Sequence, residues 1–279
     1  IVATLTFLPF TTFVAKNIIR YFPDKQVDRD ISTPSILHLD EKVLDQPMAA
    51  FNNAQAEIGG VVGLLERVVG SLVRPFIDEK PRTDVEDPEL KFMDGINQRL
   101  DKISYLNDHI NTYLLKASRE DLSESQSKEV FALVSVVNYL GSINNIVKLR
   151  FELLTNKQDS LEDNFSEESQ QEIINYHNKL IKQVKRLNKF FIKFDRTKAE
   201  KIVAKGIKYK NMEEKYRLEH FQRMRGNITE SVARHQLHVE LMDMLKEINT
   251  FIELIASTLL QIDVVEESGR DNNFNDNPR

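Results

Sequence analysis

The sequence contains no cysteine and no tryptophan among its 279 residues. The lack of cysteine excludes a disulfide framework, thiolate metal ligands and a cysteine nucleophile, and it is compatible with a cytosolic setting. Glycine and proline are also scarce, with nine and eight residues. So few helix breakers favour long uninterrupted helices over an architecture of strands and turns.

Charge is plentiful but unevenly distributed. The net charge is −5, so no global basic field points to nucleic acid. Residues 179–225 nevertheless hold sixteen lysines and arginines against five acids, a net charge of +11, which leaves −16 for the remainder of the chain. This stretch is therefore expected to present a basic surface.

The longest periodic stretch runs from Glu230 to Ile262 and contains no glycine or proline. Apolar residues recur in it every three or four positions, which places them on one stripe of an α-helix. A helix of this length measures about 50 Å and needs partner helices to cover its stripe. The stripe consists of Leu237, Leu241, Leu245, Ile248, Ile252, Ile255 and Leu259.

Five further helical segments precede this one, so the sequence predicts an all-α fold of two consecutive antiparallel three-helix bundles, residues 47–156 and 165–263. The letters LKEIN at 245–249 echo LGSIN at 140–144, an offset of 105 residues, which suggests a helical unit used twice. Four pairs of residues predict helix starts, three of them with the spacing of a capping box. These are Asp87 with Pro88, Ser123 with Gln126, Thr197 with Glu200, and Asn227 with Glu230.

The ends of the chain have a different composition. Residues 1–15 are mostly apolar and four basic residues follow by position 29, which predicts the end of a transmembrane helix over 1–22 with everything downstream on the cytoplasmic side. A buried strand or short core helix is the alternative. Residues 23–46 are expected to form a linker, because they contain Pro23 and Pro34 and are followed by Pro47. The polar residues 264–279 are expected to form a disordered tail.

The linker sequence LDEKVLDQP at 39–47, followed by Ala49 and Ala50, resembles the segment after the last membrane helix of bacterial sodium/phosphate cotransporters. FLPF at 7–10 resembles the end of that helix, and residues 238–249 resemble the last helix of the PhoU-like domain that these transporters carry. The resemblance spans the chain in order and in helix count. It implies a cytoplasmic, regulatory PhoU-like domain of a multi-pass membrane protein that transports phosphate with sodium.

Some PhoU domains also bind iron or zinc clusters through acidic pairs spaced one helical turn apart. The third helix of the family commonly reads NDLERIGD, whereas this chain reads NYLGSINN at 138–145. In the sixth helix Glu240 keeps an acid, but Met244 stands four residues later. An amide and a thioether are poor ligands for a hard cation, so those clusters are not carried over to this chain.

A different set of residues is the candidate for a transition metal, although no cofactor is expected. His235 and His238 are neighbours on the sixth helix, and the turn at Gly226 returns the chain from the end of the fifth helix. Zinc requires three or four such ligands to converge, and solvated or interhelical polar contacts are the alternative. The candidate ligands are His235, His238, Glu240, Glu219 and His220.

The basic stretch is a candidate surface for anionic lipid headgroups of the inner leaflet, for an acidic protein partner or for a second copy of the chain. A merely solvated face is the alternative. No nucleic-acid reading motif is present. The candidate residues are Lys182, Lys185, Arg186, Lys189, Lys193, Lys201, Lys205 and Lys208.

Motifs of catalysis are missing from the sequence: it has no glycine-rich phosphate loop and no nucleophile elbow. We therefore expect a regulatory domain that acts through its helix surfaces and not an enzyme. A stand-alone helical scaffold and a metal-binding sensor are the alternatives.

Overall fold

The computed structural model describes residues 35–77, 83–193, 195–226 and 231–272. These residues are all-α, as the sequence predicts, and no strand occurs among them. The predicted membrane helix and the linker up to residue 34 lie outside the described residues. The elements are η1 (Glu41–Val43), α2 (Pro47–Ser71), α3 (Arg74–Ile77), α4 (Phe92–Ala117), α5 (Glu124–Ser160), α6 (Glu167–Ile192), α7 (Arg196–Gly226) and α8 (Val232–Asn272).

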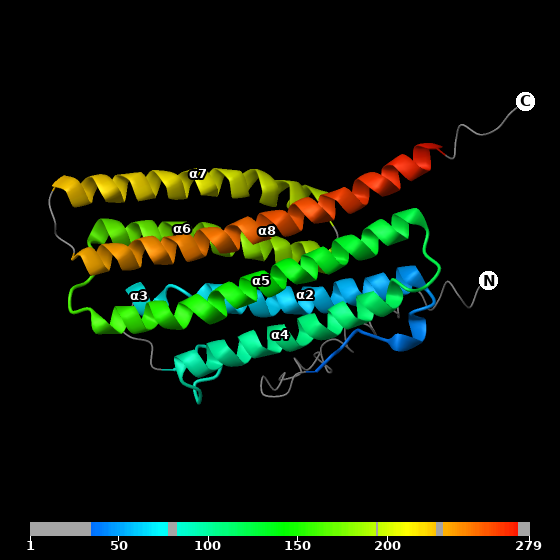
Figure 1. Cartoon of the computed structure of the whole chain (residues 1–279), viewed down its shortest axis with the longest axis horizontal. Helices are drawn as coiled ribbons and strands as arrows, with labels where there is room; N and C mark the ends of the chain where they lie inside the picture. Colours follow the sequence, from blue (N-terminus) through cyan, green and yellow to red (C-terminus); the bar gives the residue numbers. More distant parts are fainter. Residues whose placement is uncertain (1–34, 78–82, 194, 227–230, 273–279) are drawn as a thin grey trace, which may run out of the picture. The chain divides into compact units, whose positions relative to one another are not determined.

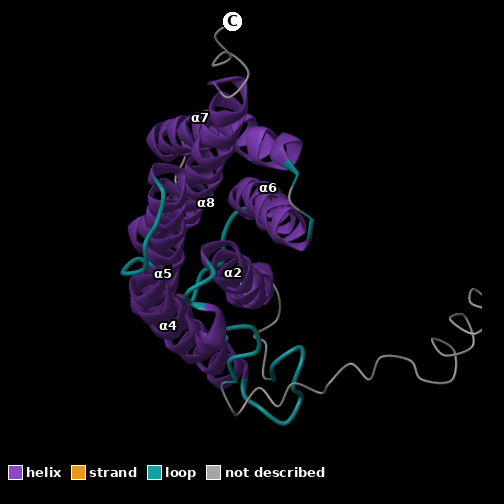
Figure 2. Ribbon diagram, turned by 90° about the vertical axis from the view of Figure 1, so that its right-hand side faces the viewer, coloured by secondary structure: helices purple, strands orange, loops and turns teal. Residues whose placement is uncertain are grey.

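The long helices form two layers that share one core. Seen end on, α4, α5, α8 and α7 follow one another in a curved row, and α2 and α6 lie together on one side of it (Figure 2). Consecutive long helices alternate in direction (Figure 1). The connections after α4, α5, α6 and α7 are short, which favours this alternation, whereas a longer segment that contains α3 separates α2 from α4. The first set of long helices, α2, α4 and α5, is in mutual contact, and so is the second set, α6, α7 and α8. Across the two sets, α5 packs on α8 and α2 packs on α6. The two sets therefore pack side by side.

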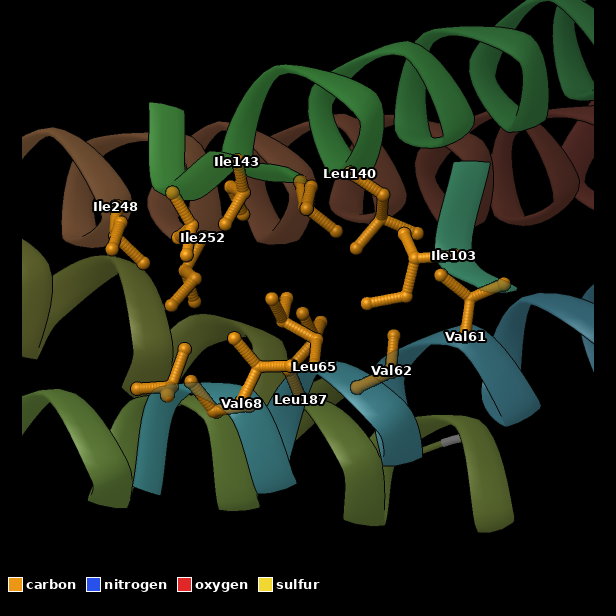
Figure 3. Packing of buried hydrophobic residues seen from close by; sticks show 14 of the residues in the cluster. Val61, Val62, Leu65, Val68, Ile103, Leu140, Ile143, Leu187, Ile248 and Ile252 are labelled. Carbon is orange, nitrogen blue, oxygen red and sulfur yellow. The ribbon is translucent and has the colours of Figure 1, made fainter. Parts of the chain in front are cut away.

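The shared core is apolar and continuous. Figure 3 shows Val62 and Leu65 of α2 facing Leu140 of α5 and Ile252 of α8 within one cluster. Every member of the predicted α8 stripe, from Leu237 to Leu259, is buried. Removing a Leu or Ile side chain from water contributes about 1.5–3 kcal/mol. The stripes thus hold α5 and α8 together as well as each set of three helices.

The repeated phrase occupies matching places in the two sets. Asn144 of α5 donates its side-chain amide to Ser104 Oγ of α4 at 2.8 Å. Asn249 of α8, 105 residues later, donates to the Gly206 carbonyl of α7 at 3.3 Å. Both asparagines are 1% exposed. Each therefore ties the last helix of its set to the helix before it.

The predicted capping box at the start of α5 is confirmed: Ser123 accepts from the Gln126 amide, and the Gln126 side chain accepts from the Ser123 amide. The predicted start at Asp87 is wrong, because α4 begins at Phe92. The Asp87 carbonyl closes a turn with the Leu90 amide, and an isolated bridge pairs Thr83 with Lys91, whose backbone is extended just before the helix. Local capping chemistry at Asp87 thus forms a turn and not a helix.

Another helix start differs from the sequence prediction. Asp195, not Thr197, caps α7, because its carboxylate accepts from the Thr197 amide at 3.1 Å. Glu200 instead pairs with Arg196. The proposed cap of the sixth helix at Asn227 and Glu230 lies outside the described residues, and Ser231 Oγ accepts from the Arg234 amide at the start of α8.

The helix predicted at the start of the first bundle is interrupted between α2 and α3, and the helix predicted at the end of the second bundle, α8, is longer than expected. The chain leaves the helix after Ser71 and re-enters it at Arg74 as α3. Pro75 explains the break, because proline has no amide hydrogen to bond the carbonyl four residues earlier. The other end of the chain stays helical to Asn272, so α8 overlaps the stretch predicted as a disordered tail.

Among the described residues, one helix, α5, is long and apolar enough to cross a membrane by length and composition. Half of its most apolar window is buried inside the protein. Val136, Leu140 and Ile143 of this helix belong to the shared core. Packing against the other helices therefore accounts for part of the apolar character of α5, whereas Phe131, Leu149 and Leu153 of this helix are exposed.

Candidate functional site

Three titratable side chains converge in the interior where α6 begins, α7 ends and α8 begins, at the left of Figure 1. Glu172 comes from α6, His220 from α7 and His238 from α8, and they are 6%, 4% and 1% exposed. One possible ligand atom from each lies within 4.8 Å of the others. We refer to these three residues as the His–Glu cluster.

The imidazole rings of the cluster are stacked. The His220 ring lies 4.0 Å from the His238 ring, at an interplanar angle of 24°. On α8, His235 adds a third ring, 4.3 Å from His220 and nearly parallel to it. Ser169 Oγ of α6 lies 3.3 Å from His220 Nδ1. Residues from three helices thus fix the orientation of these rings.

Arg223 of α7 neutralises the carboxylate of the cluster. Its Nη1 lies 2.9 Å from Glu172 Oε1, and its Nη2 donates to Oε2 at 2.9 Å. Nη2 also approaches His220 Nδ1 at 3.1 Å. Burial by itself would raise the pKa of the Glu172 carboxyl, but His238 and Arg223 beside it lower that pKa below its ordinary value. The carboxylate is therefore ionised at neutral pH.

Of the five residues proposed from the sequence as metal ligands, the structure brings His220, His235 and His238 together and keeps two apart. Glu240 turns to α5, where Lys157 Nζ lies 2.5 Å from its carboxylate. Glu219 pairs with Lys215 at 3.6 Å. Helix geometry explains this separation, because residues one or two positions apart project in different directions from the same helix.

Sequence reasoning missed Glu172 and Arg223. Glu172 lies in the second turn of α6, beside the apolar stripe that continues through Ile173, Tyr176 and Leu180. An acid at an inward position of an amphipathic helix is the signal that could have found it. Arg223 gives no such signal, because it is one of many basic residues in its stretch of the chain.

The proposed basic surface lies on α6 and α7. Lys182, Lys185, Lys189, Lys193, Lys201 and Lys208 are exposed, and Arg186 and Lys205 are half-buried. Arg186 donates to Gln183 Oε1 at 2.7 Å. Among the described residues, no carboxylate pairs with the six exposed lysines. Their charge thus faces solvent.

The chain is similar to curated proteins whose provisional names assign them phosphate export. It is 25% identical over 275 residues to a protein of Escherichia coli K12, and 23% identical over 273 residues to one of Salmonella typhimurium. Both carry the provisional name inorganic phosphate export protein YjbB. The alignments cover 97% and 96% of this chain and 48% of each relative.

The chain therefore spans about half the length of the curated relatives it matches. No family model matches the sequence. No solved structure matches it either.

Proposed function

We propose that this chain is the regulatory helical part of an inorganic phosphate transport protein. The observation that carries the proposal is the similarity, over nearly the whole chain, to proteins whose provisional names assign them phosphate export. The PhoU-like character, the coupling to sodium and the location on the cytoplasmic side of the cell membrane are part of this proposal. They rest on the resemblance of residues 39–50 and 238–249 to sodium/phosphate cotransporters.

The domain would act through its helix surfaces and not by catalysis. The exposed lysines of α6 and α7 support this role, because they suit the anionic headgroups of the inner leaflet or an acidic partner protein. Each lysine close to an anionic membrane contributes about 1 kcal/mol to binding. A basic face held near the membrane by residues 1–22 would bind lipid or a partner protein, and this binding would alter the activity of the transport part.

The test of transport uses the full-length protein in cells that lack their own phosphate transporters. Radiolabelled phosphate is loaded, and its flux across the membrane is followed with and without a sodium gradient. We expect expression to create a phosphate flux that sodium modulates. A flux no different from that of the empty vector would overturn the assignment to phosphate transport.

The regulatory role is tested in the same cells by charge reversal. The variant replaces Lys182, Lys185, Lys189 and Lys201 with Glu. The control replaces Lys128 and Lys148 with Glu; these two lysines lie in the other set of helices and pair with Glu124 and Asp101. We expect the first variant to transport phosphate but to lose the dependence of flux on intracellular phosphate, while the control behaves as wild type. Unchanged regulation in the first variant would remove the basic face from the proposal.

Membrane contact has its own measurement. Purified protein is sedimented with vesicles of phosphatidylcholine alone or with phosphatidylglycerol added. We expect more protein to sediment with the vesicles that contain phosphatidylglycerol than with phosphatidylcholine alone. Charge reversal at the four lysines should reduce the amount that sediments with the anionic vesicles. Equal sedimentation with both kinds of vesicle would favour an acidic protein partner.

A further inference from the structure

The His–Glu cluster has the composition of a transition-metal site. Two imidazoles and one carboxylate face a common point from three helices, and their ligand atoms lie within 4.8 Å of one another. Imidazole nitrogen and carboxylate oxygen together suit zinc and its neighbours, whereas calcium and magnesium prefer oxygen ligands alone. None of the three residues belongs to the acidic pairs that the family resemblance would imply.

A second observation is independent of this convergence. His238 is 1% exposed, and neither of its ring nitrogens makes a hydrogen bond to another described residue. Its Nε2 lies 3.4 Å from Glu172 Oε2, near the limit of a useful hydrogen bond. Buried polar atoms almost always have partners, so an imidazole left in this state requires an explanation. A bound cation provides one.

Arg223 shows how the cluster is stabilised without an ion. Its guanidinium supplies the positive charge that the buried Glu172 carboxylate needs, through two contacts of 2.9 Å. The Arg223 side chain is itself 35% exposed, so it can leave the carboxylate for solvent. Arg223 and a metal ion would compete for the Glu172 carboxylate, because either positive charge neutralises it.

We propose that Glu172, His220 and His238 bind a divalent transition-metal ion of the zinc type, and that Arg223 occupies the carboxylate when no ion is bound. Two atoms bound tetrahedrally to one zinc ion lie about 3.4 Å apart, so binding draws the three side chains closer than they are here. His235 stacks on His220 but is not a ligand. The ion joins the ends of α6, α7 and α8, independently of any role in phosphate transport.

The test is a zinc titration of the purified intact protein after treatment with a chelator, with a chromophoric chelator as competitor and elemental analysis of the bound metal. We expect one zinc ion per chain in the wild type, and at least about a tenfold loss of affinity in Glu172→Gln and in His238→Gln. His109→Gln is the matched control, because His109 lies on α4, where its ring contacts Tyr105 of the same helix. It should bind zinc as wild type does.

Loss of binding through misfolding is excluded by a variant that gains affinity. Arg223→Met removes the competing cation, and we expect it to bind zinc about tenfold more tightly than wild type. His235→Gln should keep wild-type affinity. Zinc below one ion per chain in the wild type, or an unchanged affinity in both His238→Gln and Arg223→Met, would overturn the proposal.

Discussion

At the scale of residues, a buried ion pair joins the segment that precedes α4 to that helix. Arg99 of α4 donates to both carboxylate oxygens of Asp84, and the two side chains are 2% and 0% exposed. Asp84 also accepts from the backbone amides of Glu86 and Asp87. Burial alone would raise the pKa of the Asp84 carboxyl, but Arg99 and these amides lower it below its ordinary value. The pair fixes the chain just before the helix.

Arg99→Met is expected to lower the free energy of unfolding by about 3–5 kcal/mol, because it leaves the Asp84 carboxylate buried without its counter-ion. Urea unfolding of the variant and the wild type measures the change. Lys128→Met is the control, since Lys128 and Glu124 form an exposed pair on α5. It should cost less than about 1 kcal/mol. Equal costs in the two variants would show that the buried pair is not stabilising.

At the scale of elements, a buried histidine joins α6 to α2. His177 of α6 donates from Nε2 to the Val69 carbonyl near the end of α2, at 2.7 Å. The side chain is 5% exposed. Burial lowers the pKa of His177 below its ordinary value, and the hydrogen bond to the carbonyl offsets only part of that effect. Burial of His177 between the two helices therefore favours the neutral imidazole.

This contact predicts a dependence of stability on pH. Because the pKa of His177 is lower in the folded than in the unfolded chain, its contribution is complete above about pH 6.5 and is lost as pH falls below that value. Between pH 6.5 and 5.5 the loss is at most about 1 kcal/mol, the limit for one proton. His177→Gln should lose less stability than wild type over this interval.

Urea unfolding at several pH values measures that difference. His220 and His238 are also buried and are unchanged in His177→Gln, so only the difference between wild type and His177→Gln reports on the contact. Parallel curves for the two proteins would contradict the prediction. Matching curves for wild type and His109→Gln serve as the control, because His109 is only partly buried on α4.

At the scale of the whole helical unit, the two sets of helices behave as one core. Ion pairs reinforce the packing of α5 on α8: Arg150 of α5 contacts Glu247 at 2.6 Å and Asp243 at 3.5 Å. Arg217 of α7 reaches Asp243 as well, at 3.0 Å. The described residues from Pro47 onward are thus joined across both sets by apolar and charged contacts.

A common core predicts cooperative unfolding. Ile103→Ala in α4 and Ile248→Ala in α8 each remove a fully buried side chain, and each should cost about 2–5 kcal/mol. Hydrogen exchange in urea, followed separately in α4 and α7, measures the response of each set. We expect either substitution to destabilise both helices equally. Destabilisation of only the set that carries the change would mean that the sets unfold independently.

The matched control for this experiment is Leu149→Ala, because Leu149 lies on α5 with 69% of its surface exposed. Its effect should stay within about 0.5 kcal/mol. An effect as large as that of Ile248→Ala would mean that the change acts on α5 as a helix and not through the core.

The sequence alone determined the fold class, the six long helices and the buried stripe of α8. Apolar residues at helical spacing are local signals, and burial of each stripe fixes the rotation of its helix. The capping box at Ser123 and the repeat that contains Asn144 and Asn249 are also local, and the structure has both. Starts at Asp87 and Thr197 were misplaced, because neighbouring acids and prolines offer the backbone competing turns.

Only the tertiary structure decided which polar side chains meet. Glu172 and His238 are 66 residues apart, and their contact depends on how far α6 and α8 are shifted along one another. That shift is set by interdigitation of side chains from several helices and by the connections between them, which no local pattern encodes. The same packing turned Glu240 toward Lys157 and placed the two sets of helices side by side.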